Sequence, residues 1–412
     1  MIKKVIKKVT PIKRKLNITN LKSLIKKSKN LTFNDDKIYS LYGLETLNFY
    51  MPDGEVLNAN KINERYFFHM TDGYLYECSH ENCERILSIG YKKPLFFEIN
   101  ISGKKEILVL TEKGGFILSK KQIFQFIEVV DGCFCQGRGI FANEKEVFYT
   151  EPYNLDIDTN SLTLCGKVWL DDEKERVIGV YSLDKSVYVF SKSNLYKLTF
   201  DTQGGNISLK KLSDDNFDIA DLSFAKSDEE CAFISNGQLY KFSNGKIEKV
   251  NAIDFSKYYF LSQAKIVDSK YYVNILDNNV DSLIYIYDFI KKEQTLLSMP
   301  NEIVNSGEIV AKDRTAKQIT LNKNVNGNRE LTLLPIDFND CKRKTLTGVN
   351  AYLEDECILE ITGDFGKKRY SLLGGFNSIL TNLNSRAFML KFYTDKNFSI
   401  EKLSLEYIYK GE

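Results

Sequence analysis

Residues 221–250 read DLSFAKSDEECAFISNGQLYKFSNGKIEKV, and this stretch decides the fold. It contains four short runs of β-type residues, separated by an acidic turn at 227–230, by Asn236-Gly237 and by residues 243–246. An Asn-Gly pair between alternating apolar residues is a strong hairpin signal, because a tight turn needs the positive φ angles that these two residues tolerate. The stretch therefore predicts four consecutive antiparallel strands.

Similar stretches recur along the chain at intervals of about forty residues. Their most apolar runs start 40, 40, 40, 45, 40 and 46 residues apart, and they are 66–70 (YFFHM), 106–110 (EILVL), 146–150 (EVFYT), 186–190 (SVYVF), 231–235 (CAFIS), 271–275 (YYVNI) and 317–321 (KQITL). Four strands per repeat are what a propeller blade needs, because neighbouring blades cover one another's apolar faces. The sequence predicts an all-β protein with a β-propeller of about seven blades. A pair of β-sandwiches with evenly spaced strands is the alternative.

Segments outside the repeat predict further parts of the chain. We expect a basic N-terminal arm at 1–40, the propeller at 41–350 and a small β-sandwich-like domain at 351–412. Within the arm, the spacing of apolar residues at 20–29 predicts a short amphipathic helix.

The charge of the chain is divided unevenly between its start and the remainder. The formal net charge is +2, yet residues 1–30 contain eleven Lys and Arg and no acid, which leaves 46 basic against 55 acidic residues, near −9, afterwards. A cationic arm on an acidic body is expected where the arm contacts phosphate or an acidic protein surface. A solvated Lys-rich tail is the alternative. The residues predicted to make this anion or partner contact are Lys3, Lys4, Lys7, Lys8, Lys13, Arg14, Lys15, Lys22, Lys26, Lys27 and Lys29.

Both histidines of the chain lie close in sequence to two cysteines. His69, Cys78, His80 and Cys83 have the residue types of a zinc site. If residues 71–73 form a hairpin turn, His69 lies near the turn and Cys78 at the far end of the return strand, so only Cys78, His80 and Cys83 cluster. We expect no metal, with these three as the remaining zinc candidates, and favour a reduced cross-strand cysteine pair. The eight cysteines lack a regular spacing, which predicts mostly reduced thiols.

The sequence gives little support to catalysis. It has two His, and it lacks a phosphate-binding loop, a nucleophile elbow, an HExxH motif and a dinucleotide fingerprint. We expect neither enzymatic activity nor a cofactor. A propeller enzyme acting on glycans is the less favoured alternative, because carboxylates alone would have to act as acid and base. No secretory signal and no apolar run long enough to span a membrane are present.

The last strand-like residues resemble a known class of proteins. Residues 386–409 read RAFMLKFYTDKNFSIEKLSLEYIY, with an arginine-led strand, a short polar turn, a Phe-x-Ile strand and a closing apolar and aromatic strand. This ending resembles that of tailed-bacteriophage tail proteins of the tail-hub or nozzle class, members of which carry β-propellers. The resemblance implies a structural virion protein, assembled in the host cytoplasm.

The resemblance also implies a set of partners. It implies a homo-oligomeric ring that extends the DNA channel below the portal and contacts other tail or portal-adaptor proteins. The basic arm would then contact packaged DNA without sequence specificity, while an acidic body would repel the DNA and let it slide. The competing interpretation is a cellular β-propeller that serves as a protein-interaction scaffold, with the basic arm docking an acidic partner.

Overall fold

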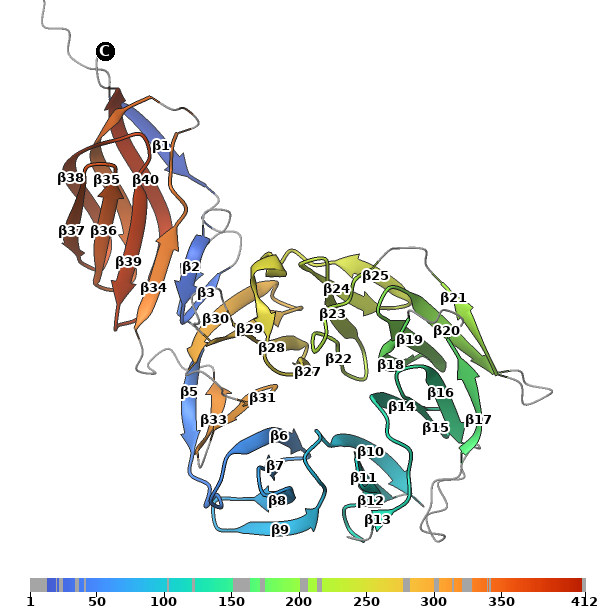
Figure 1. Cartoon of the computed structure of the whole chain (residues 1–412). Coiled ribbons are helices and arrows are strands. Elements are labelled where there is room, and N and C mark those ends of the chain that lie inside the picture. Colours follow the sequence, from blue (N-terminus) through green and yellow to red (C-terminus); the bar gives the residue numbers. More distant parts are fainter. Residues whose placement is uncertain are drawn as a thin grey trace, which may run out of the picture. The chain divides into compact units, whose positions relative to one another are not determined.

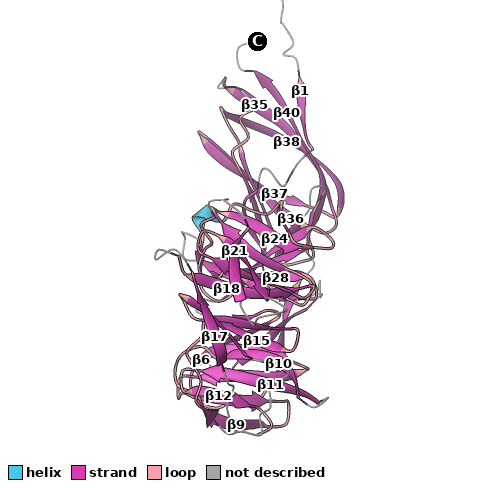
Figure 2. Ribbon diagram, turned by 90° about the vertical axis from the view of Figure 1, so that its right-hand side faces the viewer, coloured by secondary structure: helices cyan, strands magenta, loops and turns pink. Residues whose placement is uncertain are grey.

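The computed structural model consists almost entirely of β-strands, with one short 3-10 helix (Phe255–Lys257) among the described residues (Figure 1, Figure 2). The structure describes residues 13–19, 21, 25–33, 37–40, 42–101, 104–120, 123–150, 164–170, 175–200, 207–212, 217–276, 282–299, 304–312, 315–320, 328–338, 340 and 342–409. The chain forms two compact units. We call Thr46–Ile290 with Met299–Gln318 the propeller unit, and Met1–Glu45, Lys291–Ser298 and Ile319–Glu412 the sandwich unit.

Five sheets of the propeller unit each contain four strands that follow one another in the chain and pair antiparallel. They are β6 (Val56–Ile62), β7 (Arg65–Met70), β8 (Tyr74–Cys78) and β9 (Cys83–Ser88); β10 (Leu95–Ile101), β11 (Lys104–Thr111), β12 (Gly114–Ile117) and β13 (Ile123–Phe124); β14 (Asp131–Cys135), β15 (Arg138–Ala142), β16 (Glu146–Thr150) and β17 (Leu164–Trp169); β18 (Val177–Leu183), β19 (Ser186–Ser191), β20 (Leu195–Phe200) and β21 (Ile207–Lys211); and β22 (Ala225–Lys226), β23 (Cys231–Ser235), β24 (Gln238–Ser243) and β25 (Lys246–Lys249).

Two further groups of strands continue this series. In the first, β28 (Lys270–Leu276) pairs with β26 (Tyr259–Phe260), β27 (Lys265–Val267) and β29 (Ser282–Asp288). The second is a sheet of β31 (Val304–Ser306), β32 (Ile309–Lys312), β33 (Thr315–Thr320) and β5 (Gly43–Leu47), so that strands from both ends of the repeat region share it. In Figure 1 the sheets follow one another around the unit as blades. The predicted all-β propeller fold is confirmed, and the number of blades stays a prediction.

Apolar side chains between neighbouring sheets form the core of the propeller unit. Phe67 of β7 and Phe116 of β12 belong to one buried cluster, and Val147 of β16 and Val189 of β19 belong to another. All four side chains are fully buried. Each sheet therefore hides apolar surface against the next, which stabilises blades that could not fold alone.

The stretch that predicts the fold forms the expected strands β22 to β25. At the turn between β23 and β24, Asn236 and Gly237 adopt φ angles of 49° and 73°. A Cβ on Gly237 would lie 3.0 Å from the backbone nitrogen of Ser256, so glycine is needed for its size as well as for its φ angle. The Asn-Gly signal is confirmed as a tight hairpin.

The sandwich unit contains two antiparallel sheets. The first has the order β2 (Ile25–Lys29), β34 (Arg329–Leu333), β39 (Met389–Thr394), β36 (Cys357–Gly363) and β37 (Gly366–Leu372). In the second sheet, β40 (Ser399–Tyr409) pairs with β1 (Arg14–Ile18), β4 (Ile38–Tyr39) and β35 (Lys344–Leu353). Strand β35 also pairs with β38 (Gly375–Ser385). Strand β3 (Leu31–Phe33) pairs with β4 and with β30 (Glu293–Met299). Leu359, Leu390 and Leu405 are fully buried in this unit.

The start of the chain adopts strands where a helix is predicted. Residues Ile25–Lys29 form β2, which pairs with β34 so that Ile25 lies opposite Leu333. The predicted helix is wrong at these residues, because the backbone hydrogen bonds offered by a neighbouring strand outweigh the weak local preference of a few apolar residues. Within the part of the chain that the structure describes, no helix is long and apolar enough to cross a membrane.

Candidate binding cavity

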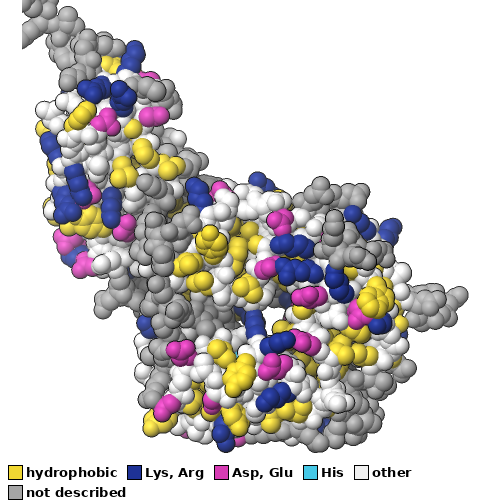
Figure 3. Space-filling view, viewed as in Figure 1, with side chains coloured by type: hydrophobic (Ala, Val, Ile, Leu, Met, Phe, Trp, Pro, Cys, Tyr) yellow, Lys and Arg dark blue, Asp and Glu magenta, His cyan; other side chains and the backbone are white. Residues whose placement is uncertain are grey.

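Strands from six successive sheets of the propeller unit surround a cavity of about 1300 Å³. Most lining residues belong to β6, β10, β14, β18, β22 and β27 or to the turns that follow them, and β15 and β20 add Arg138 and Phe200. Figure 3 shows Lys and Arg side chains gathered beside a hollow in this unit. Cavities of this size hold small organic ligands or peptide segments, which makes it the candidate functional site.

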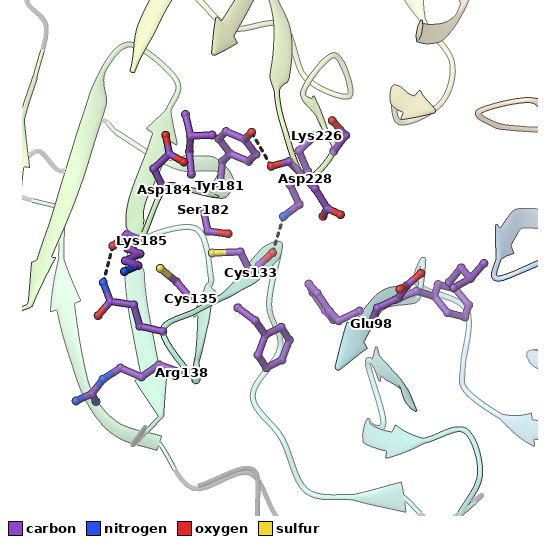
Figure 4. A pocket seen from close by; sticks show the side chains of 18 of the residues that line it. Glu98, Cys133, Cys135, Arg138, Tyr181, Ser182, Asp184, Lys185, Lys226 and Asp228 are labelled. Carbon is purple, nitrogen blue, oxygen red and sulfur yellow. Dashed lines mark hydrogen bonds between the residues drawn. The ribbon is translucent and has the colours of Figure 1, made fainter. Parts of the chain in front are cut away.

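Lys226 joins three of the strands around the cavity (Figure 4). Its Nζ donates to Asp131 Oδ1 (2.6 Å) and the Gly132 carbonyl oxygen (2.5 Å) of β14, and to the Val180 carbonyl oxygen (2.8 Å) of β18. Asp131 Oδ2 in turn accepts from the Val180 N–H at 2.8 Å. The Lys226 and Asp131 side chains are 27% and 14% exposed, so the pair is largely shielded from water. It fixes the inner strands of three neighbouring sheets to one another.

Two more lysines carry positive charge into the same region. Lys265 of β27 is partly buried, and its Nζ donates to Asn60 Oδ1 at 3.2 Å. Lys93 lies in the connection between β9 and β10, where no hydrogen bond or ion pair joins it to another described residue. Burial and the charge of Lys265 lower the pKa of Lys93 to about 7, while Asp131 opposes this fall. Burial and the charge of Lys226 likewise lower the pKa of Lys265.

One lysine of the cavity wall is already paired with two carboxylates. Lys61 Nζ contacts Glu308 Oε1 at 2.7 Å and Glu64 Oε2 at 3.2 Å. Burial acts to lower the pKa of Lys61, but these two carboxylates outweigh it and raise the pKa. Three further acids, Glu98, Asp184 and Asp228, line the wall, and Figure 4 shows them spread around it.

The thiols and the imidazole of this unit are poorly placed for nucleophilic chemistry. Cys133 and Cys135 line the cavity but are buried, and burial raises the pKa of Cys133 to about 12. The same cause raises the pKa of Cys135, so both thiols stay protonated near neutral pH. His69 is buried in β7, where Nε2 lies 2.8 Å from the Gly90 carbonyl oxygen, and burial lowers its pKa.

Among the described residues of the predicted basic arm, none lines this cavity. Lys13, Arg14 and Lys15 are exposed at β1, and the Arg14 guanidinium lies 4.4 Å from the ring centre of Tyr409. The backbone of Lys26, Lys27 and Lys29 belongs to β2, and their side chains lie outside the described residues, as do Lys3, Lys4, Lys7, Lys8 and Lys22. Their contact with an anion or partner stays a prediction.

The zinc candidates form a different arrangement. Cys78 and Cys83 lie opposite each other on β8 and β9, as expected of a cross-strand pair, but a disulfide joins them. The favoured reduced pair is therefore wrong, because strand register places the two sulfurs within bonding distance. A disulfide leaves no thiolates to bind zinc. The His80 ring lies 5.3 Å from that of Phe49, between ring centres.

Sequence reasoning missed the charged residues in and around the cavity. Lys93, Asp131, Lys226 and Lys265 span four repeats, and none belongs to a motif with close spacing. The available signal is their place within the repeat. Asp131 begins β14 and Lys226 ends β22, each the first strand of its sheet, so aligning first strands would have placed the two charges together.

Comparisons with known proteins identify no family for the chain and find only distant structural similarities. No protein-family model and no curated protein matches the sequence. Among solved structures, Hsv2 of Kluyveromyces lactis is similar at 15% identity and a TM-score of 0.32, over 61% of this chain and 86% of that one. The AfRom2 CNH domain is similar at 10% identity and a TM-score of 0.41, over 70% of this chain and 100% of that one. Puromycin hydrolase is similar at 8% identity and a TM-score of 0.39, over 77% of this chain and 60% of that one. At these values no function is carried over.

Proposed function

We propose that the chain is a non-catalytic β-propeller scaffold that binds other proteins. The chemistry of the central cavity carries this proposal. Among the described residues, its walls present lysines, separated carboxylates and protonated thiols, and no imidazole lines it. Nucleophilic catalysis needs a nucleophile beside a base, whereas fixed charges around a cavity suit binding and positioning.

A more specific form of the proposal is a structural role in the tail nozzle of a tailed phage. Its support is the ending at residues 386–409, which resembles that class, and the concentration of basic residues before residue 30. In such a nozzle, copies of the chain would form a ring and contact neighbouring tail or portal-adaptor proteins. A cellular protein-interaction scaffold is the broader form.

Quantitative proteomics across a density gradient of particles from the source culture, combined with chemical cross-linking, distinguishes these forms. A constant few copies per DNA-filled particle would support the tail role. Recovery with soluble protein, cross-linked to one defined partner, would support the cellular scaffold and overturn the tail role. If the chain sediments alone in every fraction and cross-links to nothing, the scaffold proposal itself is wrong.

The basic arm needs a separate test that spares the sandwich unit. Deleting residues 1–30 would remove β1 and β2 and so disturb the fold. Exchanging Lys3, Lys4, Lys7 and Lys8 for glutamine removes four charges that precede β1. Reduced recovery of the chain with its particle or partner would support the arm contact, and unchanged recovery at low salt would contradict it, because such contacts are strongest there.

A further inference from the structure

One sheet of the sandwich unit ends in a strand that can accept a further strand. Strand β38 is the last strand of its sheet, and among the described residues it pairs with β35 alone (Figure 1). It is eleven residues long, and no described backbone-to-backbone hydrogen bond outside that pairing involves Gly375–Ser385. Within the described part of the chain, the other side of β38 therefore presents backbone N–H and carbonyl groups without a strand partner. We call this side the open edge of β38.

The absence of charge distinguishes β38 from the other edge strands. No Asp, Glu, Lys or Arg occurs in residues 370–385. The edge strand of the other sheet in this unit, β37, contains Lys367, Lys368 and Arg369. In the five four-stranded sheets of the propeller unit, the last strand is either two residues long, as in β13, or contains charged residues, as in β9, β17, β21 and β25. Short or charged edge strands resist pairing with a second strand, and β38 has neither protection.

Large apolar side chains lie beside the open edge. Phe376 and Leu380 of β38 are 71% and 79% exposed. Ser378 lies between them and is also exposed, and residues two apart on a strand point to the same face, so the three side chains form one row. Tyr352 of β35 lies opposite Phe376 and is exposed as well. Exposed apolar side chains next to unpaired backbone groups are typical of a surface that another protein strand covers.

We propose that β38 pairs antiparallel with β38 of a second copy of the chain. A two-fold axis at Ser378 places Phe376 of each copy opposite Leu380 of the other, and it places Ser378 opposite its own copy. The strand thus supplies both members of each apolar pair, and no like charges meet. Residues 375–380 pair regularly with β35, because the register of that ladder shifts only beyond them, between Leu380 and Leu383. The proposed contact therefore uses the regular part of β38.

This pairing goes beyond the proposed scaffold and tail roles. A contact about a two-fold axis joins the same surface of both copies and closes on two of them. A ring of more copies would need a second, different interface. The pairing is also independent of the basic residues before residue 30, because it requires no charge.

Sedimentation velocity of the purified full chain, at concentrations up to about 100 μM, tests the pairing. We expect a dimer whose fraction rises with concentration and which persists in about 0.5 M salt, because no ion pair crosses the interface. Ser378→Lys places two ammonium groups directly opposite each other and should weaken dimerisation about fivefold or more. Ser371→Lys is the matched control, because Ser371 is an exposed serine on β37 of the same unit. It should leave dimerisation unchanged.

A mixture of two variants separates a lost interface from a lost fold. Ser378→Glu alone should weaken dimerisation as Ser378→Lys does, because two carboxylates then lie opposite each other. An equal mixture of Ser378→Lys and Ser378→Glu chains should restore the dimer, since opposite charges now meet across the axis. A chain that had failed to fold would not be restored in this way.

Disulfide formation tests the register of the two strands. Cys165 is the exposed one among the described free cysteines, so a Cys165→Ser chain serves as the background. In it, Ser378→Cys should form a disulfide between two copies, because Cα atoms of opposite residues on antiparallel strands lie about 4.5–5.5 Å apart. Asn382→Cys is the control and should form none, because the same axis places Asn382 far from its copy.

The outcomes are distinct. A chain that stays monomeric at every concentration overturns the proposal and leaves the open edge of β38 to a strand of a different protein. A dimer that Ser378→Lys leaves intact overturns it as well, because its interface then lies elsewhere. The proposal also fails if the mixed variants do not pair, or if Asn382→Cys cross-links as readily as Ser378→Cys.

Discussion

Replacing Lys226 with methionine should destabilise the propeller unit, because this side chain joins three sheets. Methionine keeps an unbranched side chain one atom shorter than that of lysine and removes the donor to Asp131, Gly132 and Val180. The Asp131 carboxylate then retains the Val180 N–H as its remaining donor among these contacts. Breaking a buried ion pair costs about 3–5 kcal/mol. Since Lys226 is 27% and Asp131 14% exposed, water can replace part of the loss, and we expect about 2–3 kcal/mol.

Urea unfolding followed by tryptophan fluorescence measures this loss in the right unit. The chain has one Trp, and Trp169 lies in β17 of the propeller unit, so its emission does not report on the sandwich unit. Asp131→Asn should also destabilise, and the double variant should lose less than the two single losses combined, by about 1 kcal/mol or more. Lys92→Met, at an exposed ion pair, is the control and should leave the midpoint unchanged. Additive losses, or equal effects of Lys226→Met and Lys92→Met, would refute the structural tie.

Three further predictions concern groups outside the cavity. Burial lowers the pKa of His69, so stability is complete above the unfolded-state pKa near 6.5 and should fall below it by up to about 1.4 kcal/mol per pH unit. Trp169 fluorescence at several pH values should show this slope, and His69→Phe should abolish it. Hydrogen bonds from Lys344 and Tyr409 lower the pKa of Asp340 to about 2, so the sandwich unit should lose stability as the pH falls from about 4 to about 2. Hydrogen exchange in β35 should follow that loss, and Asp340→Asn should remove it. Exchanging Cys78 and Cys83 together for serine should lower the free energy of unfolding by about 2 kcal/mol, the loop-closure value for so short a loop. Alkylation of the unfolded, unreduced chain should leave two of its eight cysteines unmodified. Modification of all eight would contradict the disulfide.

The repeat could be predicted from the sequence because each blade carries its own hairpin signals. The runs at 66–70, 106–110, 186–190, 231–235 and 271–275 all fall in the second strand of their sheets. The run at 146–150 is instead the third strand, β16, and the run that starts at residue 317 falls in β33, again the third strand. Adjacent strands have the same two-residue alternation, so the pattern identifies strands without giving their order in a blade. The even spacing of about forty residues therefore results partly from matching third strands with second strands at two of the seven positions.

The site could not be predicted in the same way. A charge pair such as Asp131 and Lys226, 95 residues apart, depends on which strands lie innermost, and a single sequence does not reveal that order. Close spacing drew attention to Cys78, His80 and Cys83 instead. There the cross-strand register was recognised, but the oxidation state depends on how near the two sulfurs are, which alternation along a strand does not specify.

The two ends of the chain show why the basic arm needs a different interpretation from the one its charge suggests. Strand β1 pairs with β40 over all five of its residues, from Arg14 opposite Tyr407 to Ile18 opposite Leu403, a pairing that local periodicity cannot predict. Lys13, Arg14 and Lys15 are consequently held on the sandwich unit and can contact a partner only where that unit does. If glutamine at Lys13 and Lys15 weakens partner recovery as much as neutralising the four lysines before β1, the contact is a surface of the sandwich unit. If partner recovery falls only when the four lysines before β1 are neutralised, the contact is made by the segment that precedes β1.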